Sequence, residues 1–491
     1  VRDANKCIYC GRCIRTCAEI QGPAVLGYIY RGFATLVAPE FGDSLTKTSC
    51  LSCGKCIDVC PVGALTERTV HYKFNPHPKD ISLQNCGLCG VGCLIQTETQ
   101  AGTITRVTTS QKEPGFNGKN LCFKGRFGWQ SFYDKDRLTV PLKKEKGIFK
   151  EISWQEATDL IAEKISLGNS QRFEISPYIS LEEMLLLKRA ADKYTTVLSA
   201  NPAFSAFSDS CISLRPQKEP YRILDNFQEY VVYGELNQVL ATLIRLQQRK
   251  GKKLTLVNYP ENPFCRFADA NYANIKEVQT TEKTLFIYNQ NRISEQEAYE
   301  LWCFASEKGK DNLLVSTDYH NHPGFLAMQP NFSLTVSDFV LGWGVYPFLS
   351  AEAKFSVAIM TFKDEKAPVD LLIPAPSYLE MEGTALSDLG QITKSANPAH
   401  SILINELMRL FYKLKWIHPN SAEIPFWNGE VEKLLLSLQN YVPAKFEPNA
   451  IKSAELSKTI KGIPSQVEKY IATLFEQRKI AIKFSGWLTS S

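Results

Sequence analysis

The chain has 491 residues, of which 44% are hydrophobic, and 56 Lys and Arg against 51 Asp and Glu give it a formal charge of +5. A chain of this length and composition can bury several cores, so we expect three or more domains. It has no apolar run near the roughly 18 residues of a membrane span, and no basic stripe interleaved with aromatic residues. We therefore expect no direct membrane span and no nucleic-acid binding.

Twelve of the fifteen cysteines fall in three groups within the first 122 residues. The first two groups are Cys7, Cys10, Cys13 and Cys17, and Cys50, Cys53, Cys56 and Cys60 followed by Pro61. Each group has the spacing C-x2-C-x2-C-x3-C of bacterial two-cluster ferredoxins, in which the fourth cysteine of each run ligates the other cluster. The spacing predicts one [4Fe–4S] cluster on Cys7, Cys10, Cys13 and Cys60, and a second on Cys17, Cys50, Cys53 and Cys56. We assign both to a ferredoxin-like domain over residues 1–79.

The third group is Cys86, Cys89, Cys93 and the distant Cys122. Between its two arms, residues 94–109 alternate polar and β-branched side chains around Ala101-Gly102, which predicts a β-hairpin. We expect a small β-rich domain over residues 80–140 that supplies all four ligands of a third [4Fe–4S] cluster. The alternatives for these groups are structural zinc sites or disulfides. Zinc sites usually lack the third and fourth thiols of a ferredoxin run, and a disulfide network is improbable in a chain with this much core.

The positive charge is concentrated where the cysteines are. Residues 1–125 contain 14 Lys and Arg against 9 Asp and Glu, whereas the remaining residues contain 42 of each. Lysines and arginines near thiolate-bound clusters would offset the negative charge and influence their potentials. Twelve thiols reserved for iron also indicate a reducing compartment, so we expect a cytoplasmic protein that reaches any membrane only through partners.

These cysteine motifs carry a resemblance to a known family. Residues 1–70, with CIYCGRCIRTCAEIQG and CLSCGKCIDVCPVGALT, resemble the two-cluster module of NAD-linked formate dehydrogenases and hydrogenases. Residues 80–160, with CGLCGVGC, LCFKGRFGW, DRLTVPL and ISWQEA, resemble the entry domain of the molybdopterin oxidoreductase superfamily, which includes the large iron–sulfur subunit of respiratory complex I. The resemblance implies that Lys124, two residues after Cys122, occupies the position between cluster and pterin, as a cofactor-binding residue. It also implies a [2Fe–2S] domain upstream of Val1, where the chain looks truncated.

The rest of the chain alternates short apolar runs with helical stretches, the pattern of doubly wound α/β domains with parallel sheets. We predict a degenerate molybdopterin-type α/β region over residues 141–440, followed by a C-terminal helical tail over 441–491. The predicted strands are 230–233, 254–258, 284–288, 313–316, 356–361 and 370–373. The predicted helices between them include 237–249 and 295–307.

Several features favour a region that has lost its molybdenum cofactor. The segment VDLLIPAPSYLEMEGTALSDLGQIT resembles the late signature of the superfamily and keeps Pro374, Glu382, Gly383, Thr384 and Gln391. It has Asp388 where the family has asparagine, and it lacks the arginine before the glutamine. Catalytic members also need a cysteine or selenocysteine ligand to the metal, with a histidine beside it in formate dehydrogenases. Cys211 lies at a plausible distance, but Ile212 follows it, and Cys211, Cys265 and Cys303 read as ordinary buried thiols.

The leading hypothesis is an electron-transfer subunit of a multisubunit NAD(P)-linked oxidoreductase. Its three clusters would relay single electrons between a flavin- and NAD(P)-binding partner and another redox unit, with further iron–sulfur subunits as neighbours. The first alternative is a molybdenum or tungsten formate dehydrogenase subunit that uses Cys211 and Lys124. The second is a structural subunit whose clusters only hold the fold together.

Overall fold

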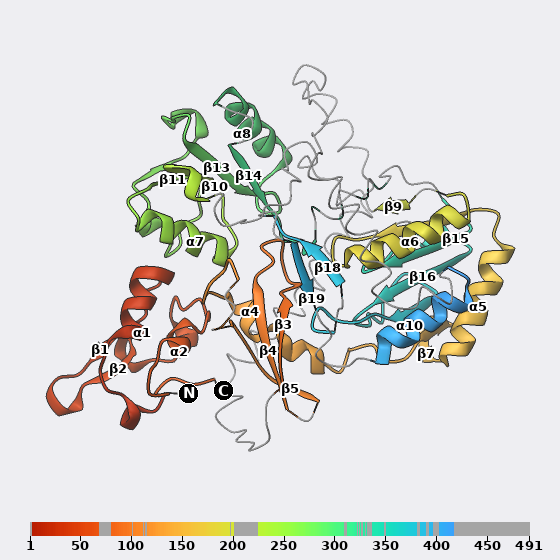
Figure 1. The fold of residues 1–491 in the computed structure, drawn as a ribbon, viewed down its shortest axis with the longest axis horizontal. Helices are drawn as coiled ribbons and strands as arrows, with labels where there is room; N and C mark the ends of the chain where they lie inside the picture. The colour runs from red at the N-terminus through yellow and green to blue at the C-terminus, as the bar shows by residue number, and fades with distance from the viewer. Residues whose placement is uncertain are drawn as a thin grey trace.

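The structure is a computed structural model (Figure 1). It describes residues 2–67, 80–100, 102–110, 112, 115–196, 198–200, 224–308, 312–321, 323, 325, 328, 330, 336–347, 350–380, 383–388, 392–395 and 402–416. The expected 441–491 tail, Cys211, Glu382 and Gln391 lie outside these residues. Within them the chain mixes helices with parallel and antiparallel sheets, as predicted.

The ferredoxin-like module is built from two similar halves. In each half a glycine in the left-handed region, Gly11 or Gly54, both with φ of 67°, opens a four-residue helix. These positions suit glycine because other residues are strained at positive φ. The module also carries one antiparallel hairpin. Its main elements are α1 (Arg12–Arg15), β1 (Leu26–Ile29), β2 (Leu36–Pro39) and α2 (Lys55–Asp58).

The second part is a three-stranded antiparallel sheet in the order β3-β4-β5. Its elements are β3 (Asp80–Asn85), β4 (Leu94–Gln100), β5 (Thr103–Thr108) and the short helix α4 (Phe123–Phe127). The hairpin predicted for residues 94–109 is confirmed by β4 and β5, which pair in antiparallel register. The loop between β3 and β4 carries three cysteines, and α4 begins directly after the fourth, so the sheet holds both arms of the third cysteine group.

The third part is an all-parallel sheet in the order β12-β11-β10-β13-β14. Its strands are β10 (Glu229–Tyr233), β11 (Lys253–Val257), β12 (Ala270–Tyr272), β13 (Thr284–Asn289) and β14 (Leu313–Ser316), with helices α7 (Gln238–Gln248) and α8 (Glu295–Lys308). All four strands and both helices predicted here are found within one residue of their expected ends. Figure 1 shows α7 on the side of the sheet that faces the ferredoxin-like module.

The fourth part is a seven-stranded sheet in the order β7-β6-β17-β16-β15-β8-β9. Its strands are β6 (Leu142–Glu145), β7 (Ile148–Glu151), β8 (Gln171–Ile175), β9 (Leu198–Ala200), β15 (Phe339–Trp343), β16 (Phe355–Met360) and β17 (Leu371–Pro374). The five strands from β17 to β9 run parallel, and the β6–β7 hairpin is added antiparallel at one edge. Parallel sheets were therefore predicted correctly here, but the antiparallel edge was not.

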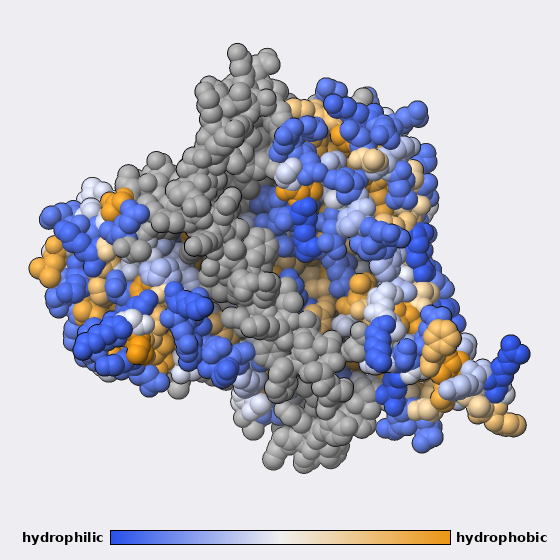
Figure 2. Space-filling view, turned by 180° about the vertical axis from the view of Figure 1, so that it is seen from behind, coloured by the Kyte–Doolittle hydropathy of each residue, from blue (hydrophilic) through white to orange (hydrophobic). Residues whose placement is uncertain are grey.

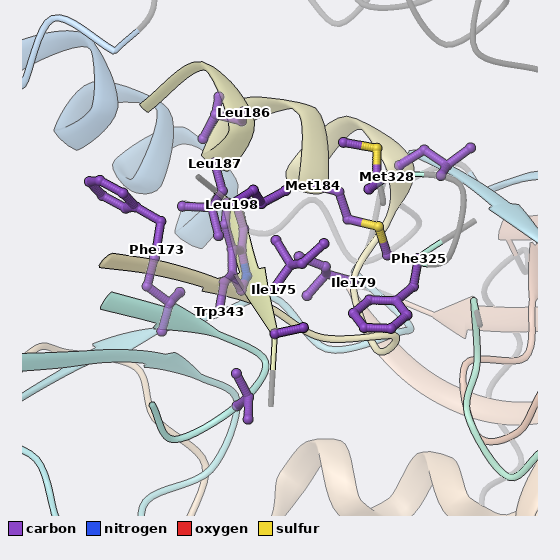
Figure 3. Packing of buried hydrophobic residues seen from close by; sticks show 14 of the residues in the cluster. Phe173, Ile175, Ile179, Met184, Leu186, Leu187, Leu198, Phe325, Met328 and Trp343 are labelled. Carbon is purple, nitrogen blue, oxygen red and sulfur yellow. The ribbon is translucent and has the colours of Figure 1, made fainter. Parts of the chain in front are cut away.

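Helices and one further hairpin complete this part of the chain. They are α5 (Trp154–Leu167), α6 (Leu181–Lys193), α10 (Ile402–Lys413), β18 (Gly383–Leu386) and β19 (Ile392–Ser395). The apolar face of α6 packs on β8 and β9, where Met184 and Leu187 meet Phe173, Ile175 and Leu198 (Figure 3). None of the helices that the structure describes is both long and apolar enough to cross a membrane.

Candidate functional site

The first thiol group surrounds a cavity in the ferredoxin-like module. Its lining includes Cys7, Cys10, Cys13 and Cys60, which are the four residues predicted to share a cluster although Cys60 comes from the other half of the module. Burial raises the pKa of the Cys60 thiol, but the backbone N–H groups of residues 62–65 lower it more, so the net shift is downward. These N–H groups favour a thiolate at this position.

The second group brings Cys17 to the cysteines of the second run. Burial raises the pKa of Cys56 to about 12, and the neighbouring thiols of Cys53, Cys50, Cys17 and Cys13 add to this effect. Cys53 is affected in the same way, with a pKa of about 11. Like charges raise a thiol pKa only when they are close. Cys17 and Cys13 therefore both lie near Cys56, and the crossed ligand assignment stays a prediction.

The third group lies on both sides of one enclosed cavity. Cys86, Cys89, Cys93 and Cys122 line it together with Lys124 and residues 237–239 at the start of α7. Cys122 is the N-cap of α4, and its Sγ accepts a hydrogen bond from the Gly125 N–H at 3.4 Å. The structure thus brings the four predicted ligands to one place and puts Lys124 at the edge of the same cavity.

The residues around the third group fit a [4Fe–4S] cluster, since four thiols line one cavity there. A Cβ on Gly125 would lie 3.6 Å from the Cys86 Sγ and 3.8 Å from the Cys122 Sγ, so both thiols border the same space beside α4. All-thiol ligands around such a space, with backbone N–H groups aimed at sulfur, suit a [4Fe–4S] cluster.

Tyr378 supplies a further polar group beside the loop of the third group, where a Cβ on Gly87 would lie 2.4 Å from the Tyr378 Cβ. Its hydroxyl is fully buried without a hydrogen-bond partner. Burial raises its pKa well above the usual value, and the nearby Cys86 and Cys122 raise it further. A buried phenol without a partner is costly, and the sulfur ligands of a bound cluster would accept a hydrogen bond from it. Sequence reasoning missed this residue because it lies more than 250 positions from the cysteines, and the late signature that contains it gave no reason to single it out.

We expect Tyr378→Phe to make the potential of the third cluster more negative, by tens of millivolts, because a hydrogen bond to sulfur stabilises the reduced cluster. The measurement is a redox titration followed by electron paramagnetic resonance (EPR). Tyr133→Phe is the control, since the Tyr133 hydroxyl already accepts a hydrogen bond from the Ile104 N–H at 2.7 Å. Equal potentials in wild type and Tyr378→Phe would contradict a role of this hydroxyl at the cluster.

Asp388, which stands where the family has asparagine, holds the loop between β3 and β4 that carries three cysteines of the third group. Its carboxylate accepts hydrogen bonds from the Thr317 N–H at 2.6 Å and the Thr317 hydroxyl at 3.1 Å. Its backbone N–H donates to the Gly90 carbonyl at 2.8 Å. A Cβ on Gly90 would lie 2.1 Å from the Asp388 carboxylate. The Asp388 carboxylate is therefore hydrogen-bonded to Thr317, which directly follows β14. Its backbone is hydrogen-bonded to Gly90, which directly follows Cys89.

Three arginines join the ferredoxin-like module to the parallel sheet. Arg245 on α7 donates from Nε to the Glu19 carbonyl at 3.0 Å, Arg249 pairs with the Glu19 carboxylate at 3.1 Å, and Arg266 donates to the Ala18 carbonyl. The acceptor residues, Ala18 and Glu19, are the two that follow Cys17 in the chain. The contact orients the segment that carries a predicted ligand of the second cluster.

The remaining thiols of the described chain show no comparable grouping. Cys265 and Cys303 are half-buried rather than fully buried, and Cys265 donates weakly to the Pro260 carbonyl at 3.4 Å. The ferredoxin-like module exposes the apolar side chains of Ile8, Tyr9, Tyr28, Tyr30, Phe33, Phe41 and Val62. Four of them, Ile8, Tyr9, Tyr30 and Val62, also line the cavity of the first group. From behind, Figure 2 shows hydrophobic residues among charged ones at the lower right, on the side of this module.

Three families match successive parts of the chain. Residues 1–66 match the ferredoxin-like domain of NADH-quinone oxidoreductase subunit 3, residues 85–134 match the molybdopterin oxidoreductase Fe4S4 domain, and residues 137–210 match molybdopterin oxidoreductase. The matches agree with the resemblance found in the sequence.

Curated relatives point the same way. An NADH-quinone oxidoreductase subunit of Rhizobium meliloti (strain 1021) is 34% identical over 203 residues, which is 41% of this chain and 23% of that protein. Subunit 3 of the same type of enzyme from Thermus thermophilus is 33% identical, over 40% of this chain and 24% of that protein. The alpha subunit of NADPH-Fe(3+) oxidoreductase from Geobacter sulfurreducens is 32% identical, over 29% and 16%. The chain spans at most about a quarter of the length of these relatives.

Proposed function

We propose that this chain, which is built from the iron–sulfur and molybdopterin-type domains of the molybdopterin oxidoreductase superfamily, is an electron-transfer subunit of an NAD(P)-linked oxidoreductase complex. Iron–sulfur clusters accept and release single electrons without breaking bonds. The observation that carries the proposal is the grouping of twelve cysteines into three sets of four. In this proposal the chain's residues bind three [4Fe–4S] clusters, shield them and hold them at fixed separations.

The proposal includes the neighbours of the subunit. A flavin- and NAD(P)-binding subunit would exchange electrons with the first cluster, where the exposed apolar side chains of the ferredoxin-like module offer a contact surface. Further iron–sulfur subunits and an upstream [2Fe–2S] domain would extend the path. A cytoplasmic location follows from the reduced thiols that such clusters need. The named relatives are subunits of NADH- or NADPH-dependent oxidoreductases, which supports this arrangement.

A formate dehydrogenase subunit is the second candidate. Its support is the molybdopterin oxidoreductase match over residues 137–210 and a relative described as a putative formate dehydrogenase from Staphylococcus aureus, 27% identical over 202 residues. Lys124 at the edge of the third thiol cavity is compatible with it. Asp388, however, is engaged with Thr317 rather than free for a cofactor. We therefore rank this function below the electron relay.

Metal analysis of the anaerobically purified protein tests the proposal. We expect about twelve irons per chain, from three clusters of four, and no stoichiometric molybdenum, tungsten or zinc. Reduction by NAD(P)H should occur within the assembled complex and not in the isolated chain. Molybdenum or tungsten at one atom per chain would favour the formate dehydrogenase function. Clusters that no physiological donor reduces in the complex would favour a purely structural role.

A further inference from the structure

Arg126 is a buried cation between the second and third thiol groups. Its side chain has no exposed surface, although it belongs to α4 of one domain and reaches into the ferredoxin-like module. There its Nε donates to the Cys53 carbonyl at 2.9 Å, and its two terminal nitrogens bind both carboxylate oxygens of Asp58. A fully buried arginine is costly unless every donor is paired, so the site is built to hold this charge.

Both ends of this contact are cluster-ligand segments. On one side, the backbone N–H of Arg126 donates to the Cys122 carbonyl at 3.0 Å in the first turn of α4. On the other side, the side chain ends on the carbonyl of Cys53, and its partner Asp58 lies two residues after Cys56. A short series of covalent and hydrogen bonds therefore links Cys122, predicted to bind the third cluster, with Cys53, predicted to bind the second.

The other half of the ferredoxin-like module shows that this arrangement is specific. The Cys10 carbonyl, equivalent to that of Cys53, accepts a hydrogen bond at 3.2 Å from Arg15 of the same module. Arg15 is exposed, whereas the donor to Cys53 is buried and comes from the neighbouring domain. The hydrogen-bonding need of the carbonyl is thus met locally in one half, and through a connection between domains in the other.

We infer that Arg126 is a positioning residue that couples the second and third clusters, by fixing their separation and by setting their relative potentials with its buried charge. This inference rests on the proposed electron relay. In the step it supports, one electron moves from one cluster to the other, so that the donor is oxidised and the acceptor is reduced by one electron, and no bond forms or breaks. Arg126 itself undergoes no chemical change.

The sign of the effect follows from electrostatics. A positive charge close to a cluster favours the added electron, and its influence is large in a buried site because solvent does not screen it. Removing the charge should make the potential of the second cluster more negative. Removing the charge of Asp58 should have the opposite sign. A residue that only supported the fold would not produce opposite shifts in these two variants.

The experiment is an EPR redox titration of the full chain and four variants, each checked for iron content. Arg126→Met should lower the potential of the second cluster by about 59 mV, which changes the equilibrium constant for one-electron exchange between the two clusters about tenfold. Arg126→Lys should keep a potential near that of wild type because it keeps the charge. Asp58→Asn should shift the potential upward. Arg106→Met is the comparison, since Arg106 pairs with Glu67 at 3.1 Å and with Asp58 at 3.9 Å in the same network without contacting Cys53, so its shift should be clearly smaller than that of Arg126→Met.

The outcomes separate this inference from the proposed function. If wild type lacks three reducible clusters, the electron relay fails. If wild type has them but Arg126→Met and Asp58→Asn leave all potentials unchanged, only the role of Arg126 is refuted. An equal shift in Arg106→Met would also refute it, because the effect would then belong to the network as a whole. If Arg126→Met loses iron, the inference is judged from the other two variants. It stands if Asp58→Asn raises the potential of the second cluster and Arg126→Lys leaves it near that of wild type, and it is refuted if Asp58→Asn causes no upward shift.

Discussion

Cys17→Ala combined with Cys50→Ala is expected to remove one cluster and leave about eight irons, because crossed ligation puts both residues on the second cluster. Cys17→Ala combined with Cys13→Ala should damage both clusters of the ferredoxin-like module, since the two residues then belong to different clusters. Two missing thiols in one cluster leave too few ligands to hold it. Iron analysis and EPR of the reduced proteins measure the difference between the two double variants.

The opposite result would identify uncrossed ligation. If each run of four cysteines held its own cluster, the Cys13 and Cys17 pair would remove one cluster and the Cys17 and Cys50 pair would damage two. The crossed result is expected, because Cys60 lines the same cavity as Cys7, Cys10 and Cys13. Cys265→Ala is the control, and its iron content should equal that of wild type.

The cysteine groups could be predicted from sequence because cluster ligation requires short, fixed spacings within each group. The crossing of Cys17 and Cys60 is a prediction from the ferredoxin pattern that the double variants above would test. The parallel strands β10 and β13 were predictable for a different reason: they are buried on both faces and therefore have largely apolar sequences.

Other parts of the fold gave no such signal. Strand β8 was missed because its sequence QRFEI contains two charges, and the structure shows that Arg172 and Glu174 are both buried and pair with each other at 3.0 Å. Alternate residues of a strand share a face, so this pair neutralises itself locally. Arg126 was missed for the converse reason, because its partner Asp58 is 68 positions away and only the docking of two domains brings them together.

Gly54→Ala is expected to destabilise the protein far more than Gly11→Ala, although the two glycines are equivalent in the two halves of the module. Both have φ of 67°, so an alanine has the same backbone strain at either position, about 1 kcal/mol. At Gly11 the new Cβ would lie 3.1 Å from the ends of the Arg15 and Tyr28 side chains, which can move. At Gly54 it would lie 2.3 Å from Cδ and 2.6 Å from Nε of Arg126.

Arg126 cannot move aside, because its guanidinium is held by the Cys53 carbonyl and Asp58 and is fully buried. Gly54→Ala must therefore displace it and leave a buried charge without its partner, which costs about 3–5 kcal/mol. We expect a lower unfolding temperature and loss of iron from the second cluster in Gly54→Ala, and nearly normal iron content in Gly11→Ala. Equal losses in the two variants would mean that backbone strain alone accounts for the glycine. A loss confined to Gly54→Ala would show that the glycine is needed to admit the arginine from the neighbouring domain.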